Sequence, residues 1–407
     1  MDTIQFRISG KEKFSIANWA QFYPEFSLRK FADLSTTERV RVREKGRLNL
    51  RKFILRVEKR DSLYIPAVEI YETANSAMEL VDYELKVTFS VPKTLFETSL
   101  LEAKESQHRD LLEKLSSKLD GIGVRMALKT MDDAPVSVVH FCKNVPLPRD
   151  ISMRSILKEF SHLDMGKAYD TTKITERKEK NNGEIVHLYS GTRDWTFYDK
   201  ILDILRPKNK SQDKFKTDYE KELLQVYSLD NIEVFRYEYR LNRMQTIRSE
   251  LNVFLKKPLK TPILVSDLFT EGLWEKVILN SWKKIIERPE NQLALISTND
   301  ALDLFLHIFK KAETNNKNGH SQNQAFWSYG LARMIKELGA KTVRQECEKI
   351  WSARSDERLN EKLAIAAELA RDLPLSDGIL HIEQNLREFK QVTLETLSTF
   401  SVKHCKV

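Results

Sequence analysis

The chain is poor in the residues that mark several special classes of protein. In 407 residues there are only 3 cysteines, 12 glycines and 11 prolines, which disfavours a disulfide scaffold, a collagen-like repeat and a proline-rich disordered chain. Cys142, Cys347 and Cys405 are scattered without a metal-ligand spacing, so we expect free thiols in a reducing, cytoplasmic setting. No apolar run is long enough to span a bilayer, and the first residues alternate like a strand, so neither a membrane segment nor a signal peptide is expected.

Common catalytic and nucleotide-binding motifs are missing as well. The sequence contains no GxxxxGK[ST] loop, no GxGxxG after a strand, no GxSxG elbow and no HExxH helix. ATP hydrolysis, dinucleotide chemistry, serine hydrolysis and zinc-protease chemistry therefore have no support.

What is present is an ordinary globular composition with a basic bias. Hydrophobic residues make up 41% and charged residues 31%, and 67 lysines and arginines against 59 acidic residues give a net charge of +8. A chain of this length is expected to form two or more domains. The positive charge favours a polyanionic partner such as a nucleic acid, because each neutralised phosphate releases counterions.

The order of periodic segments predicts an α+β protein. Up to about residue 260, runs that alternate with period two are interspersed with helical segments at 107–119, 151–163, 214–227 and 244–255. An Asn-Gly pair at 182–183 predicts a hairpin between 169–180 and 184–190. Beyond residue 263 almost every segment has helical periodicity. We therefore expect an antiparallel sheet domain, with a β-rich segment at 1–80 and an α+β domain at 81–258, followed by an all-helical C-terminal domain at 263–407.

The last helix is expected to run over 378–400. Ile379, Ile382, Leu386, Phe389 and Phe400 follow a spacing of three and four residues. This stripe predicts a face in the core of the helical domain, with a seam between two copies of the chain as the alternative.

Tyr198 attracts interest because it ends a strand and precedes an acid and a lysine, in FYDK at 197–200. Strand alternation places Trp195 and Phe197 on one face, and Tyr198 and Lys200 on the other. A phenol with a pKa near 10 is a poor nucleophile unless a cation stabilises its phenolate. Lys200 could do so, but a tyrosine with its ring in the core and its hydroxyl in water fits the same pattern.

The strand FRYEYRL at 235–241 separates aromatic from charged residues. Its aromatic residues share one face, while Arg236, Glu238 and Arg240 share the other. A carboxylate between two arginines is a common solvated strand face. If that face lines a pocket, Glu238 could bind a hard divalent cation while the arginines hold phosphates.

His140 and Cys142 are two residues apart in the β-branched run before 148, so they share a strand face. The spacing suits two metal ligands, but a hydrogen-bonded histidine in the core is the alternative. Zinc is not expected, because no second clustered pair of ligands exists.

The run ERVRVREKGRLNLRKFILRVEKR at 38–60 is strongly basic. Alternation places Arg39, Arg41 and Arg43 on one face, which is typical of a ribbon that contacts phosphates. A solvated face balanced by glutamates is the alternative. The basic stretch 206–216 could contact the same nucleic acid.

Taken in order, several of these segments resemble the rolling-circle replication initiators of plasmids and filamentous phages. The resemblance lies in YSGTR at 189–193, FYDK at 197–200 and RYEYRL at 236–241, with weaker likeness in VVHFCKNVPLP at 138–148 and SLYIPAVEIYET at 62–73. It covers roughly residues 60–255. Where relatives carry an aspartate, this chain has His140.

The resemblance implies a DNA-nicking replication initiator. Tyr198 would attack a phosphodiester, form a 5′-phosphotyrosine and free a 3′-OH for DNA replication, with Mg²⁺ or Mn²⁺ as the metal. It assigns catalysis to Tyr198 and Lys200, metal binding to Glu238 and His140, and DNA binding to Arg193, Arg236, Arg240, Arg39, Arg41, Arg43 and Trp195. Trp195 would stack on an unpaired base, although its pattern favours a place in the core.

The expected partner is origin DNA, single-stranded or supercoiled, with a helicase or a second copy of the chain as further partners and no membrane. One alternative is a catalytically inactive, basic nucleic-acid-binding protein of a mobile element. Another is a structural scaffold whose helical C-terminal half recruits a helicase or self-associates.

Overall fold

A computed structural model gives the fold of the chain. It describes residues 1–24, 48–55, 63–74, 80–166, 185–205, 218–297, 301–315, 321–350 and 355–404. The expected strand at 169–180 with its hairpin turn, the basic stretch at 206–216, and Arg39, Arg41 and Arg43 lie outside the described residues.

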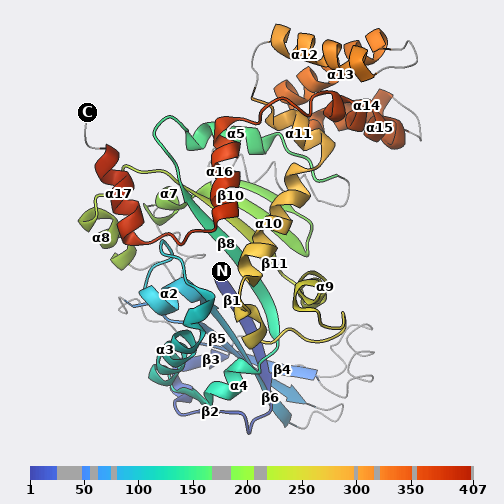
Figure 1. Ribbon diagram of the computed structural model, residues 1–407. Helices are drawn as coiled ribbons and strands as arrows, with labels where there is room; N and C mark the ends of the chain where they lie inside the picture. Colours follow the sequence, from blue (N-terminus) through green and yellow to red (C-terminus); the bar gives the residue numbers. More distant parts are fainter. Residues whose placement is uncertain are drawn as a thin grey trace.

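Within this part of the chain, nine strands form one sheet in the order β3-β4-β5-β6-β1-β8-β11-β10-β9 (Figure 1). All neighbouring pairs are antiparallel. The strands are β1 (Thr3–Ser9), β3 (Phe22–Pro24), β4 (Leu48–Leu55), β5 (Ala67–Ala74), β6 (Leu80–Ser90), β8 (Val136–Pro146), β9 (Ile185–Tyr189), β10 (Arg193–Asp199) and β11 (Val234–Leu241). A separate pair joins β2 (Phe14–Ile16) to β7 (Val124–Met126).

The described helices are α2 (Val91–Phe96), α3 (His108–Gly121), α4 (Leu128–Asp132), α5 (Met153–Ser161), α7 (Lys200–Leu205), α8 (Asp218–Val226), α9 (Met244–Leu255), α10 (Leu273–Ile286), α11 (Pro289–Leu295), α12 (Ala301–Asn315), α13 (Ser321–Leu338), α14 (Ala340–Ile350), α15 (Ser355–Leu369), α16 (Asp377–Glu388) and α17 (Leu394–His404). They include counterparts of those expected at 107–119, 151–163, 214–227 and 244–255, whereas α2, α4 and α7 were not expected. Two strand ends are set by helix capping. Strand β6 ends at Ser90, because Ser90 caps α2 and a proline occupies the first turn of that helix. Lys200 begins α7 instead of ending β10.

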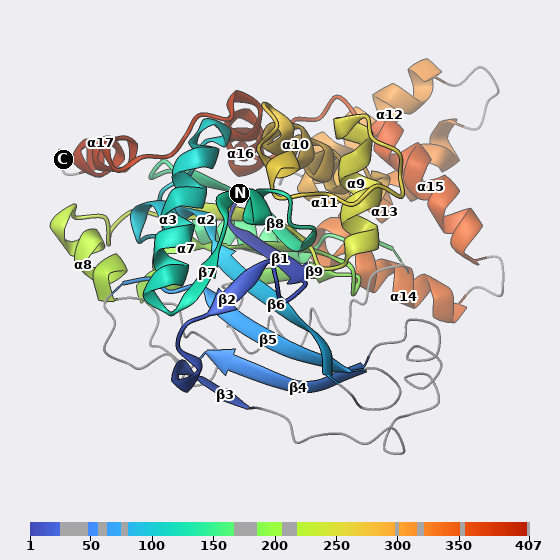
Figure 2. The same cartoon turned by 90° about the horizontal axis from the view of Figure 1, so that it is seen from below.

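The sheet has one apolar and one polar face. Ile4, Phe6 and Phe141 point to the apolar face and are fully buried. Helices α2, α3, α9, α10 and α16 lie on the same side of the sheet (Figure 2). Along β1, β6 and β5 the opposite face carries charged pairs that keep partial exposure, as between Arg7 and Glu84. This amphipathic arrangement is the one that strand alternation predicts for an antiparallel sheet.

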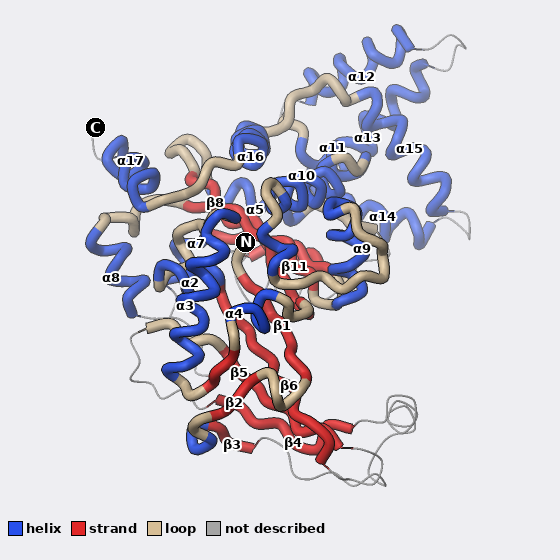
Figure 3. Tube along the Cα trace, turned by 60° about the horizontal axis from the view of Figure 1, so that its bottom comes forward, coloured by secondary structure: helices blue, strands red, loops and turns tan. Residues whose placement is uncertain are grey.

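The helical C-terminal half is continuous with the sheet core. Every described element beyond residue 261 is helical apart from isolated bridges, as expected. However, α10 contacts β8 and α9, and α16 contacts β8 and α5, so a single hydrophobic core runs through both halves. Figure 3 shows α11 to α15 gathered in a helical lobe beside the strands. The expected boundary near residue 260 therefore marks a change in secondary structure, and no break in packing.

The single helix expected over 378–400 is two helices. Phe389 ends α16 in a left-handed conformation with φ of 46°, and α17 begins at Leu394. Ile379, Ile382 and Leu386 are fully buried inside the chain. The core interpretation of this stripe is thus confirmed for these three residues, which have no surface left for a second copy.

No helix in the described ranges is long and apolar enough to cross a membrane.

Candidate functional site

The residues singled out by the sequence meet on three adjacent strands. Tyr198 on β10 pairs with Arg236 on β11, and Arg236 in turn pairs with Asn144 on β8. Since paired residues of antiparallel strands point to the same face, these side chains project from the polar face of the sheet. Glu238, two residues along β11, lies beside them.

Glu238 is the centre of the cluster. Its Oε1 accepts a hydrogen bond from the Tyr198 hydroxyl at 2.6 Å and from Nε of Arg236 at 2.7 Å. Its Oε2 accepts from Nε of Arg240 at 2.8 Å and from the same guanidinium's Nη2 at 2.5 Å. The carboxylate thus holds two arginines and one phenol, all with charge-assisted hydrogen bonds.

Arg236 is the most deeply buried of these groups, with 1% of its surface exposed. Besides Glu238 it contacts Asp2 Oδ1 through Nη2 at 2.6 Å, and its Nη1 donates to the Ser99 carbonyl at 3.0 Å and to Asn144 Oδ1 at 3.2 Å. Burying a guanidinium is costly unless it is paired and hydrogen-bonded. Asp2 and Asn144, which sequence reasoning did not select, supply those partners.

The environment sets the protonation states of the cluster. Burial alone would raise the pKa of the Glu238 carboxyl, but Arg240 and Arg236 hold that pKa well below its usual range. Burial and then the charge of Glu238 raise the pKa of the Tyr198 phenol well above its usual value. Burial followed by Arg240 lowers the pKa of His140 to about 4. At neutral pH the site therefore holds a carboxylate, a neutral phenol and a neutral imidazole.

The cluster is closed at one end and open at the other. Tyr198 is 8% exposed and Glu238 3%, whereas the Arg240 side chain keeps 28% of its surface. Arg240 pairs in register with the partly exposed His140 on β8. A ligand would therefore reach the site along the His140 and Arg240 side.

Lys200 reaches the same region from the first turn of α7. Its Nζ lies 5.9 Å from the centre of the Tyr198 ring and 3.3 Å from Asp203 Oδ2. The turn into α7 is fixed by Asp199, whose Oδ1 accepts from the backbone N–H of Ile201 at 2.8 Å and of Leu202 at 3.3 Å. This is an ordinary N-cap, and it carries Lys200 to the tyrosine side although the strand has ended.

Two other expected DNA contacts lie away from Tyr198. Arg193 faces the opposite side of β10, where its Nη2 pairs with Glu250 on α9 at 2.8 Å. Trp195 is fully buried and stacks on Tyr239 with ring centres 5.1 Å apart. As it stands, Trp195 has no surface on which a base could stack, and its packing fits the core interpretation. Arg236 likewise has no free surface, because it is buried under its partners.

The residues expected to hold a divalent cation do not form a ready metal site. Both oxygens of Glu238 already accept hydrogen bonds from arginines, so an ion would have to displace a guanidinium. His140 is neutral and chemically able to ligate. Within the described residues, no group of three or more histidine, cysteine or acidic side chains is positioned to share a metal ion. Cys142 is buried with a raised pKa, caused by its burial.

Comparison with known protein families, with curated proteins and with solved structures finds no match to this chain.

Proposed function

We propose that the protein nicks DNA through Tyr198 and becomes linked to the 5′ phosphate, in the manner of a plasmid or phage rolling-circle initiator. The observation that carries the proposal is the hydrogen bond of 2.6 Å from the Tyr198 hydroxyl to Glu238. It places a phenol directly against a carboxylate that also holds two arginines. A nucleophile in contact with a base, and that base in contact with orienting groups, is the general arrangement for covalent catalysis.

The arginines supply the means to activate the phenol. While they bind Glu238 they keep its pKa low, and a weakly basic carboxylate does not take the phenol's proton. A DNA phosphate entering past Arg240 would compete for that guanidinium, because arginine binds phosphate and carboxylate in the same bidentate geometry. Once Arg240 turns to the phosphate, the pKa of Glu238 rises and the carboxylate becomes able to accept the proton.

The reaction then balances without a further reactant. The Tyr198 oxygen forms a bond to phosphorus as its proton passes to Glu238, and the bond from phosphorus to the 3′ oxygen breaks. The leaving 3′ oxygen takes a proton from the Lys200 ammonium or from water, giving a 3′-OH. Arg240 neutralises charge on the non-bridging oxygens. The phosphotyrosine keeps the energy of the original diester, so the strand can be resealed.

Mg²⁺ or Mn²⁺ remains a hypothesis that rests on the resemblance alone, because Glu238 is occupied by arginines. Charge neutralisation is assigned here to Arg240 and Lys200. Running the same reaction with and without Mn²⁺ measures any contribution of an ion separately.

A nicking assay tests the proposal. The full chain is incubated with a supercoiled plasmid that carries the DNA surrounding its coding sequence, and open circles with protein on the 5′ end are expected. Tyr198→Phe should form no adduct while it still binds the plasmid. Tyr219→Phe is a matched control, because Tyr219 is an exposed tyrosine on α8, and it should nick as the wild type does. Nicking by Tyr198→Phe at the wild-type rate would refute the assignment.

A basic nucleic-acid-binding protein without cleavage activity is the second candidate. The raised pKa of Tyr198 and the complete occupation of Glu238 favour it, since both describe a stable, closed cluster. In that case the wild type and Tyr198→Phe should bind DNA equally, and neither should form an adduct.

A further inference from the structure

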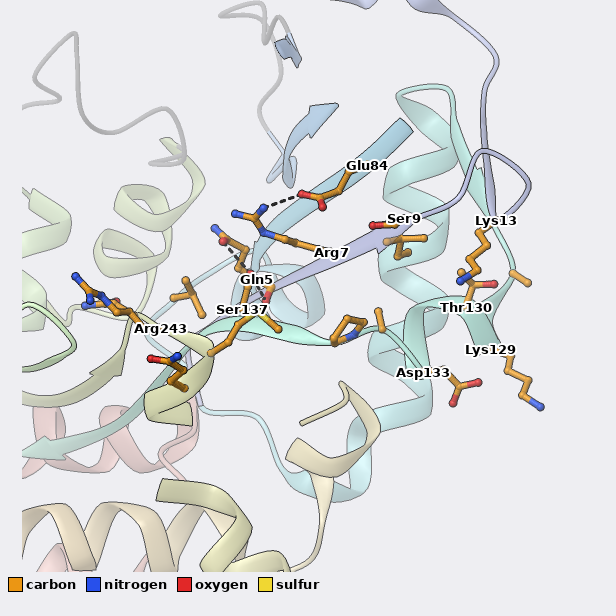
Figure 4. Close-up of a pocket in the computed structure, with 18 residues that line it drawn as sticks. Gln5, Arg7, Ser9, Lys13, Glu84, Lys129, Thr130, Asp133, Ser137 and Arg243 are labelled. Atoms are coloured by element: carbon orange, nitrogen blue, oxygen red, sulfur yellow. Dashed lines mark hydrogen bonds and ion pairs between the residues drawn. The ribbon is translucent and has the colours of Figure 1, made fainter. Parts of the chain in front are cut away.

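A groove of about 1090 Å³ opens next to the tyrosine cluster. The register pairs of strands β1 and β8 end at Phe6 and Val136, and the register shifts between Gln5 and Phe6. Beyond this point β1 continues to Ser9, whereas the chain before Val136 turns into α4. The two strands therefore diverge, and the start of α9 forms the other side of the opening (Figure 4).

The groove lies along the same strands as the site of Tyr198. Gln5 and Val138 line the groove and form a register pair. The next pair on the same face, Thr3 with His140, lies beside Arg240. Asn242 lines the groove as well, and its Nδ2 donates to Asp194 on β10 at 3.1 Å. Four strand residues, about 13 Å, separate Val138 from Cys142, which is in register with Glu238. Because the Tyr198 hydroxyl contacts Glu238, the groove lies a few nucleotides from that hydroxyl.

The lining combines apolar residues with a charged rim, on which the basic residues Arg7, Lys13, Lys129 and Arg243 outnumber Glu84 and Asp133. Apolar surface comes from Ile8, Ala134, Pro135, Val138 and Met244. Figure 4 shows Arg243 and Lys13 on opposite sides of the groove, with Arg7 between them. Arg7 pairs with Glu84, but Lys13 and Arg243 are exposed and, within the described residues, form no ion pair.

We propose that this groove binds an unpaired stretch of DNA next to the scissile phosphate. Its apolar residues would cover base faces while Lys13 and Arg243 contact phosphates at its two sides, which is how single strands are bound without sequence preference. The volume is close to the upper end of sites for small ligands, which suits a couple of nucleotides and is too small to enclose a duplex. The choice of DNA as the ligand rests on the proposed nicking function.

Salt dependence of binding gives a sharp test. The full chain is titrated against a short fluorescent oligothymidine, and the logarithm of the association constant is plotted against the logarithm of the salt concentration. Each phosphate contact on a single strand contributes about 0.7 to the slope. Arg243→Gln and Lys13→Gln should each reduce the slope by about 0.7, and the double variant by about 1.4, with several-fold weaker binding.

Neither substitution should disturb folding. Arg243 is the residue before α9, but its side chain makes no capping hydrogen bond. Lys310→Gln serves as the matched control, because Lys310 is an exposed lysine on α12, which lies in the helical lobe away from β1 and α4 (Figure 1). It should bind with the wild-type slope. Far-ultraviolet circular dichroism checks that all variants keep their secondary structure.

Three results would overturn the groove assignment. These are a wild type that does not bind the oligothymidine, groove variants with the wild-type slope, and equal binding of a duplex of the same length. The result for the groove can be distinguished from the result for the proposed nicking function. If the wild type forms a Tyr198 adduct while the groove variants bind normally, nicking stands and the groove assignment fails. If the groove variants show the reduced salt dependence of binding but the wild type forms no adduct, the groove assignment stands and the nicking proposal fails.

Discussion

Replacing Glu238 by glutamine should destabilise the protein strongly, although the shape of the side chain hardly changes. Glu238 is 3% exposed and Arg236 1%, and the carboxylate compensates the charges of Arg236 and Arg240 through contacts of 2.7 and 2.8 Å. Glutamine keeps one oxygen acceptor but removes the negative charge, so the buried guanidinium of Arg236 loses one of its two counter-ions.

The size of the effect follows from what remains. Breaking a buried ion pair costs about 3–5 kcal/mol when the surviving charge has no other partner. Arg236 retains Asp2 at 2.6 Å, and Arg240 can turn toward solvent, so we expect the lower end, about 3 kcal/mol. For a chain of 407 residues that unfolds as one unit, this corresponds to a decrease in melting temperature of about 3–4 °C.

The measurement is a thermal melt of the full chain at neutral pH. Glu383→Gln is the control, because the partly exposed Glu383 pairs with the exposed Arg387 four residues along α16, and such a helical pair contributes about 0.3–0.5 kcal/mol. If Glu238→Gln and Glu383→Gln have the same melting temperature, the charge of Glu238 does not hold the arginines, and the electrostatic account of the site is wrong.

Further predictions concern protonation and the phenol. Burial raises the pKa of Asp199 to about 6, so its protonated form stabilises the fold below about pH 4 and this contribution is lost as the pH rises through 6. Asp199→Asn keeps an N-cap but has no carboxyl group to titrate. In urea unfolding, its free energy of unfolding relative to the wild type should therefore increase by about 3 kcal/mol from pH 4 to pH 7. A difference that stays constant over this pH range would contradict the prediction. The lowered pKa of His140 means that stability is lost as the pH falls from 6.5 toward 4, and His140→Gln should show a shallower loss in acid titrations. Tyr198→Phe removes one hydrogen bond to a carboxylate that keeps both arginines, so urea unfolding should show a loss of only about 1.5 kcal/mol; a loss as large as that of Glu238→Gln would show that the phenol is essential to the network.

Much of the fold can be predicted from periodicity. The alternation in 235–241 predicts that its aromatic residues share one face and that Arg236, Glu238 and Arg240 share the other, and the sheet confirms this. The aromatic face is buried in the hydrophobic core. Local pattern succeeds here because side chains of a strand alternate by geometry. It does not show that α10 and α16 cover the sheet, since this packing joins residues far apart in the chain.

The burial of the site could not be predicted in the same way. A carboxylate between two arginines is typical of a solvated face, yet Glu238 and Arg236 are buried. The cause is long-range. The partners of Arg236 come from three distant parts of the chain. Asp2 lies at the N-terminus, Asn144 lies on β8, and the Ser99 carbonyl comes from the segment after α2. The groove likewise arises where two strands diverge, which leaves no local signal.

The proposed reaction requires the Tyr198 hydroxyl as the nucleophile that attacks phosphorus. Mass spectrometry of the covalent complex tests this requirement most directly. After reaction with DNA and digestion by nuclease and protease, the peptide that carries the nucleotide is sequenced by fragmentation. We predict a 5′-phosphate ester on Tyr198, absent from Tyr198→Phe. A nucleotide attached to any other residue, or cleaved DNA with no attached peptide, would contradict the central claim.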